Sequence, residues 1–160
     1  NRDYAAAENE LKALQKADKK LFEANNYDYL LARMAAKRGD FALAAANFQA
    51  VANRNSVLKE YALWHLSQIA RSSGNLMLER LYLREIQTIA PESLLTKAVN
   101  ARMARSYFEG KNYDSAINLF SGQWSAVSGQ KEESATGKGQ RTKDERLNRE
   151  NLVLLGESYL

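Results

Sequence analysis

The chain contains no cysteine, one proline and one histidine among its 160 residues. The absence of cysteine excludes disulfides, thiolate catalysis and zinc–thiolate sites, and it leaves the cellular compartment open. No run approaches the ~20 consecutive apolar residues that a transmembrane helix needs, so no membrane span is predicted. Because proline is rare, β-branched residues are few and alanine is abundant, the composition favours helix almost throughout the chain.

Basic residues are not gathered into a block. The net charge is +4, but the basic pairs Lys19-Lys20 and Lys37-Arg38 are short and lie among acidic residues. Proteins that bind nucleic acid more often cluster their basic side chains, and no nucleic-acid partner is predicted. Hydrophobic residues make up 45% of the chain and charged residues 26%, which indicates a single globular domain over 1–160 rather than disorder.

No grouping of side chains indicates catalysis or metal binding. His65 has no second histidine or cysteine to act with, and it is interpreted as a structural or surface residue. The acidic pair Glu8 and Glu10 lies on a surface helix, where nothing raises a pKa. The segment Gly137-Lys138-Gly139 lacks the strand and helix of a phosphate-binding loop. We therefore expect this chain to have no enzyme activity, no cofactor and no metal.

A turn that contains glycine recurs three times with regular spacing. The turns are Gly39-Asp40-Phe41, Gly74-Asn75-Leu76 and Gly110-Lys111-Asn112-Tyr113, each between two amphipathic helices. In the first turn, glycine supplies the left-handed residue of a helix end, and Asp40 caps the next helix. Such a repeat predicts antiparallel helix hairpins that bury their apolar faces against their neighbours, as in a solenoid.

The hydrophobic pattern divides the chain into segments. Residues 1–23 are predicted to form one helix, either the second helix of a preceding repeat or a capping helix. Large apolar residues nearly vanish from 125–143, which indicates a flexible polar insertion. The last segment, 144–160, reads as the first helix of a truncated repeat. Three predicted helix hairpins lie between these ends, at 25–54, 60–92 and 97–124.

The two ends of the chain differ from complete repeats. The first residue is Asn1 rather than Met, and the last helix stops where a turn and a partner helix would follow, so we expect the chain to be part of a longer protein. The open ends of a solenoid present apolar surface, which predicts self-association. The first predicted helix carries an apolar stripe at spacings of three and four, formed by Ala7, Leu11, Leu14, Ala17 and Leu21.

The hairpins resemble the tetratricopeptide repeat family, whose unit is about 34 residues long. The equivalent positions Ala44, Glu79 and Ala116 are 35 and 37 residues apart, although Glu79 stands where the family has a small residue. Further matches to the family pattern are Leu31, Ala32, Phe48, Leu66, Ser67, Pro91, Ala104, Tyr107, Phe120, Leu155, Gly156 and Tyr159. The resemblance implies an all-α fold, namely a right-handed α-α superhelix of antiparallel helix hairpins. Another α-α solenoid is the alternative.

Two stretches, Tyr61–Asn75 and Ala104–Ile117, are also similar to the helical scaffold of bacterial soluble lytic transglycosylases. Those enzymes carry a superhelical repeat region ahead of a lysozyme-like catalytic domain that cleaves peptidoglycan. The catalytic Glu-Ser motif of that domain is not visible in the sequence, so the resemblance implies a non-catalytic scaffold region, with peptidoglycan as a further partner. This resemblance would place the protein in the bacterial cell envelope or periplasm. Without it, the expected compartment is the cytoplasm.

Partners of repeat solenoids usually dock on the concave side, which the first helices of the hairpins form. Aromatic and arginine side chains, which are enriched at interfaces, fall at the positions that the tetratricopeptide pattern exposes there. We therefore predict a groove for a peptide or partner protein, with acidic groups in that partner. Each aromatic could instead pack between hairpins, and each arginine could be solvated charge. The predicted partner-binding residues are Asn26, Tyr29, Arg33, Lys37, Tyr61, Trp64, Gln68, Arg71, Arg105 and Phe108.

Overall fold

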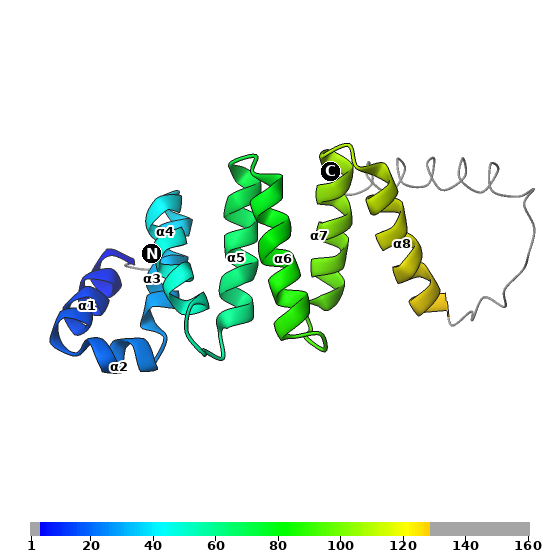
Figure 1. Cartoon of the computed structure of the whole chain (residues 1–160). Coiled ribbons are helices and arrows are strands. Elements are labelled where there is room, and N and C mark those ends of the chain that lie inside the picture. The colour runs from blue at the N-terminus through cyan, green and yellow to red at the C-terminus, as the bar shows by residue number, and fades with distance from the viewer. Residues whose placement is uncertain (1–3, 129–160) are drawn as a thin grey trace, which may run out of the picture. The chain divides into compact units, whose positions relative to one another are not determined.

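The computed structural model describes residues 4–128, and this part of the chain is helical, with eight helices and no strand. The expected all-α class is confirmed. Figure 1 shows the helices in order along the chain. Their bounds are α1 Tyr4–Ala17, α2 Lys19–Ala24, α3 Tyr27–Lys37, α4 Phe41–Ala52, α5 Lys59–Ser72, α6 Leu76–Ile89, α7 Thr96–Glu109 and α8 Tyr113–Ser128.

The chain forms two compact units, residues 1–102 and 103–160, and the division falls within α7. In unit 1, α3 with α4 and α5 with α6 form two antiparallel helix hairpins, and α4 also packs against α5. Helix α1 and the short helix α2 contact each other and α3. The described residues of unit 2 comprise the second part of α7 and all of α8.

The first two turns have the backbone geometry that the sequence predicts. Gly39 and Gly74 have positive φ angles of 81° and 75°, which glycine adopts without the steric penalty of a Cβ atom. The side chain of Asp40 accepts a hydrogen bond from the backbone N–H of Leu43 at 3.1 Å, and Asn75 caps α6 in the same way. In each hairpin of unit 1, the side chain of the capping residue therefore satisfies one of the free N–H groups at the start of the second helix.

The third turn reaches the same geometry with a different residue. Its left-handed residue is Lys111, with φ 60°, and not the glycine that the sequence offers at Gly110. The side chain of Asn112 then caps α8 by accepting from the backbone N–H of Ser115 at 3.2 Å. In all three turns the left-handed residue directly precedes the capping residue. The cap therefore decides which residue takes the strained conformation.

The N-terminal segment is two helices rather than the one helix expected over 1–23. Helix α1 ends at Ala17, and the side chain of Asp18 accepts from the backbone N–H of Leu21 at 2.8 Å, which caps a new helix. The predicted apolar stripe is largely exposed, with Leu21 at 48%, and the buried residues are Glu8 and Phe22. After the break at Asp18, α2 runs in a different direction from α1 (Figure 1).

The core of unit 1 alternates small and large side chains across the two hairpins. Alanine at the contacts lets helices approach closely, and larger side chains fill the remaining space. Residues 125–128, which were predicted to belong to a flexible polar insertion, are helical and form the end of α8. The rest of that predicted insertion, up to residue 143, and the predicted helix at 144–160 lie outside the described residues. The buried apolar residues of α3 to α6 are Leu31, Ala32, Ala35, Ala44, Phe48, Val51, Ala52, Ala62, Leu63, Leu66, Ala70, Leu83 and Ile86.

Candidate interaction surface

Helices α3 and α5 are the first helices of the two hairpins in unit 1, and they run in the same direction because α4 reverses the chain between them (Figure 1). Their outward side chains follow the helical spacing of three and four residues. The most exposed apolar members are Leu30 at 47% and Tyr61 at 37%. We call this surface the α3–α5 face, and it consists of Leu30, Arg33, Lys37, Tyr61, Trp64, Gln68 and Arg71.

Three rings join the two helices beneath this face. The imidazole of His65 stacks on Phe48 of α4, with ring centroids 4.8 Å apart and planes 19° from parallel. Tyr29 meets Phe48 edge-on at 5.4 Å, and its hydroxyl lies 3.2 Å from His65 Nε2. Tyr29 is therefore half-buried between the hairpins, which is the packing role that the sequence left open for each aromatic residue. This seam fixes the positions of α3 and α5 relative to each other.

Two residues of the face act directly on His65. Burial lowers the pKa of the His65 imidazole below its ordinary value, and the positive charge of Arg33 lowers that pKa further, whereas a hydrogen bond with Gln68 raises it. The net direction is downward, so His65 is neutral at neutral pH. The structure thus brings Arg33 of α3 and Gln68 of α5 together around one titratable side chain.

Asn26 has a structural role at the start of α3. Its backbone is left-handed, with φ 55°, and its side-chain oxygen accepts hydrogen bonds from Ser56 Oγ at 2.6 Å and Arg54 Nη2 at 3.2 Å. Arg54 also donates to the buried Asp28 at 2.7 Å. This network ties the N-terminus of α3 to the α4–α5 loop. Asn26 is thereby occupied within the fold, and we do not include it in the α3–α5 face.

Trp64 is half-buried and has a cation beside its ring. The guanidinium carbon of Arg102 lies 5.9 Å from the ring centroid, which is within the range of a cation–π contact. Arg102 also forms an ion pair with Glu79, with 2.8 Å between Nη2 and Oε1. Glu79 is 1% exposed, although the repeat pattern calls for a small residue there. One side of Trp64 is therefore covered within unit 1.

The predicted residues Arg105 and Phe108 belong to unit 2 and are described there alone. Arg105 Nε donates to Glu109 Oε1 one helical turn away, at 3.1 Å. Phe108 is 39% exposed and meets Tyr113 edge-on, with centroids 5.5 Å apart. The predicted partner-binding residues are thus divided between the two units, and Arg105 and Phe108 are not among those near His65 in unit 1.

Leu30 of the α3–α5 face, and His65 beneath that face, were not selected from the sequence. Leu30 lies three residues before Arg33 on the same outward stripe, so helical spacing alone could have included it. His65 was interpreted as structural or surface; its ring stacks on Phe48 in the seam, and Arg33 and Gln68 act on its pKa. The sequence offered one signal for this position: His65 is three residues before Gln68, a spacing that brings two side chains together on a helix.

Searches against known proteins found no matching family model, curated protein or solved structure. Within residues 4–128, no helix is long and apolar enough to cross a membrane. That same part of the chain holds no group of three or more histidine, aspartate or glutamate side chains arranged to bind a metal ion. The tetratricopeptide and transglycosylase resemblances therefore stay predictions, and a functional proposal has to rest on the α3–α5 face.

Proposed function

We propose that this chain is a non-catalytic interaction scaffold that binds a peptide or a partner protein along the α3–α5 face. The observation that carries this proposal is the exposure of Arg33, Tyr61 and Gln68 on two helices that the aromatic seam holds in fixed register. Rigid helices that present aromatic and arginine side chains lose little conformational entropy on binding. A surface of this kind suits recognition of an extended partner.

The arrangement we propose for the whole chain is the tetratricopeptide-like superhelix. The residues that cap the second helices, Asp40, Asn75 and Asn112, recur at intervals of 35 and 37, close to the repeat length of about 34 in that family. In such a superhelix the first helices line the concave side. Arg105 and Phe108 belong to the proposed surface through this repeat pattern alone.

The experiment that tests the proposal is a selection of binding peptides from a random library. Peptides selected on the wild-type chain are then measured against two triple variants by fluorescence anisotropy. The control variant replaces exposed residues of α6, so that the two variants alter similar amounts of surface on different helices. The face variant is Arg33→Ser, Tyr61→Ser, Gln68→Ala, and the control is Leu81→Ser, Arg84→Ser, Thr88→Ala.

We expect the face variant to lose affinity by about tenfold or more, because truncating central aromatic and arginine contacts costs about 1–2 kcal/mol each. The control variant should bind within about twofold of the wild type. Circular dichroism of both variants verifies that their helices remain formed. Equal loss of binding in the two variants, or no loss in the folded face variant, would contradict the proposal.

The second interpretation is a scaffold region of a peptidoglycan lytic transglycosylase, and the same variants distinguish it from the peptide-binding scaffold. Co-sedimentation with insoluble peptidoglycan measures it directly. Retention of the wild type and of the face variant, without any selected peptide, would favour the cell-wall scaffold over the peptide groove. This interpretation rests on the two similar sequence stretches, Tyr61–Asn75 and Ala104–Ile117.

A further inference from the structure

The α3–α5 face carries more positive than negative charge. Its basic members are Arg33, Lys37 and Arg71, and Arg33 makes no ion pair with another described residue. The two helices hold only two acids. Asp28 is buried in its pair with Arg54, and Glu60 is half-buried in the first turn of α5. The charge of the face therefore complements an anionic partner.

His65 lies where such a partner would change its electrostatic surroundings. From α3, the hydroxyl of Tyr29 lies 3.2 Å from its Nε2, and Arg33, one helical turn after Tyr29, acts on it through its charge. The uncharged ring of Phe48 stacks on it from α4, and Gln68 of its own helix forms a hydrogen bond with it. No carboxylate of the described residues acts on the imidazole. The free protein thus exposes His65 to the charge of one cation and to partial burial, both of which oppose its protonation.

We propose that an acidic side chain or carboxylate of the partner binds at Arg33 beside His65, and that binding is coupled to uptake of a proton by His65 from the solvent. The inference rests on the proposed function of the α3–α5 face. A carboxylate at this point neutralises the field of Arg33 and supplies a negative charge to the imidazolium. The partner is then held more tightly at mildly acidic pH than at pH ~8, by linkage between proton and ligand binding.

The size of the effect follows from the same linkage. If the bound partner raises the pKa of His65 by one unit, binding is strengthened by about tenfold at a pH below the pKa of both the free and the bound protein. His65 is the only histidine of the chain, and histidine is the side chain whose ordinary pKa falls between about 5 and 8. A pH dependence in that window therefore reports on one residue.

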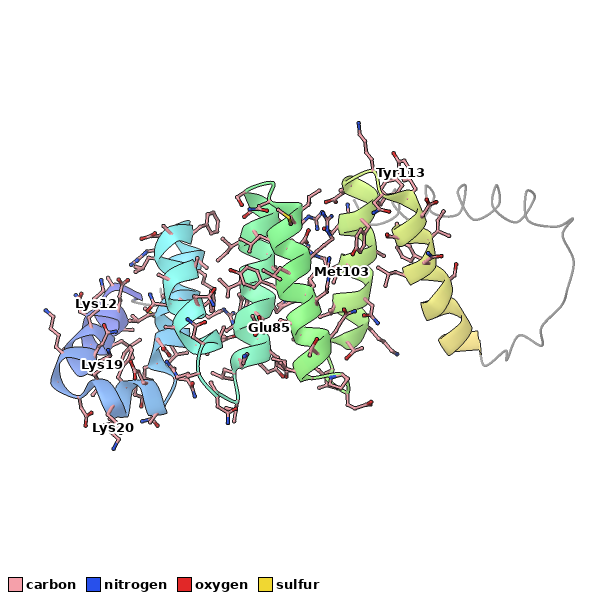
Figure 2. All side chains as sticks on the ribbon, in the orientation of Figure 1. Lys12, Lys19, Lys20, Glu85, Met103 and Tyr113 are labelled. Atoms are coloured by element: carbon pink, nitrogen blue, oxygen red, sulfur yellow. The ribbon has the colours of Figure 1, made fainter. Side chains whose placement is uncertain are left out.

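The probe is a labelled short peptide of alternating glutamate and alanine, with a glutamine–alanine peptide as its uncharged match. Affinity is measured at pH ~7.5 and ~5.5, where glutamate remains largely ionised. We expect the acidic peptide to bind wild type roughly three- to tenfold more tightly at the lower pH. His65→Asn should abolish this ratio, Arg33→Gln should weaken binding at both pH values, and Lys20→Gln should change neither, because Lys20 is exposed on α2 (Figure 2).

A second measurement does not depend on variants that alter the seam. The NMR signal of the His65 ring proton is titrated with and without saturating acidic peptide, and we expect its midpoint to rise when the peptide is bound. An unchanged midpoint overturns the proposal, as does a pH ratio that persists in His65→Asn. If the uncharged peptide binds as tightly as the acidic one, the proposal of an acidic partner is overturned, but the proposed function is not. If neither peptide binds while library selection yields others, the inference alone fails; if selection also yields none, both fail.

Discussion

Removing the cation of the buried Glu79–Arg102 pair should destabilise the chain strongly. Glu79 is 1% exposed, its Oε1 lies 2.8 Å from Arg102 Nη2, and its Oε2 has no hydrogen-bond partner in the described part of the chain. In Arg102→Met the carboxylate stays buried without its counter-charge. Breaking a buried pair in this way costs about 3–5 kcal/mol. Because the Arg102 side chain is 21% exposed, we expect the lower end, about 3 kcal/mol.

The assay is urea and thermal denaturation of the full chain. A loss of about 3 kcal/mol lowers the melting temperature by roughly 6–12 °C in a protein of this size. The double variant Glu79→Met, Arg102→Met removes both charges and keeps similar side-chain volume, so it should return to within about 1 kcal/mol of the wild type. Two results together would refute the reasoning: a destabilisation by Arg102→Met of less than about 1 kcal/mol, and a double variant whose change in stability equals the sum of the changes in Glu79→Met and Arg102→Met.

Four further predictions concern the seam, two of the turns and the buried Asp28. The folded-state pKa of His65 is lowered, so its contribution to stability is complete above the unfolded pKa of about 6.5 and is lost as pH falls through the folded pKa. Between pH ~7.5 and ~5.5, urea titrations should therefore show a smaller loss of unfolding free energy in His65→Gln than in wild type. Lys111→Gly should raise the free energy of unfolding by about 1 kcal/mol because it relieves a left-handed backbone. Gly74→Ala should lower it by about as much, although the added Cβ meets no neighbour. Asp28→Ala should cost about 3 kcal/mol because it strands the guanidinium in the α4–α5 loop, whereas Glu10→Ala, on the exposed side of α1, should stay within about 0.5 kcal/mol in the same thermal melts.

The turns show how far local sequence signals reach. Gly39 was predicted as a left-handed helix end and has that geometry, as does Gly74 in the second predicted turn, because the requirement is set within a few residues of backbone. In the third turn the left-handed residue is Lys111, next to the capping Asn112. The regular position of the caps was visible in the sequence and is the better guide. The same holds for Asp18, whose capping role divides the first predicted helix in two.

The candidate surface was predictable in its exposed residues and not in its organisation. The tetratricopeptide pattern placed Arg33 and Gln68 at exposed positions, and both side chains are exposed. It could not show that Asn26 is engaged by the α4–α5 loop, or that Tyr29 packs against Phe48. Those contacts depend on how separate helices approach each other, and spacing within one helix contains no information about that.

The sequence by itself determined the helical class and the positions of the hairpin turns, since propensity and capping act over a few neighbouring residues. Only the tertiary structure decided which residues meet across longer separations. His65 lies 36 residues from Tyr29 in the chain, yet their polar atoms are 3.2 Å apart. The buried charge of Glu79 conflicts with the repeat pattern until Arg102 is placed beside it. Such partnerships arise because burial makes an unpaired polar group costly, and the packing of the helices determines which side chain satisfies it.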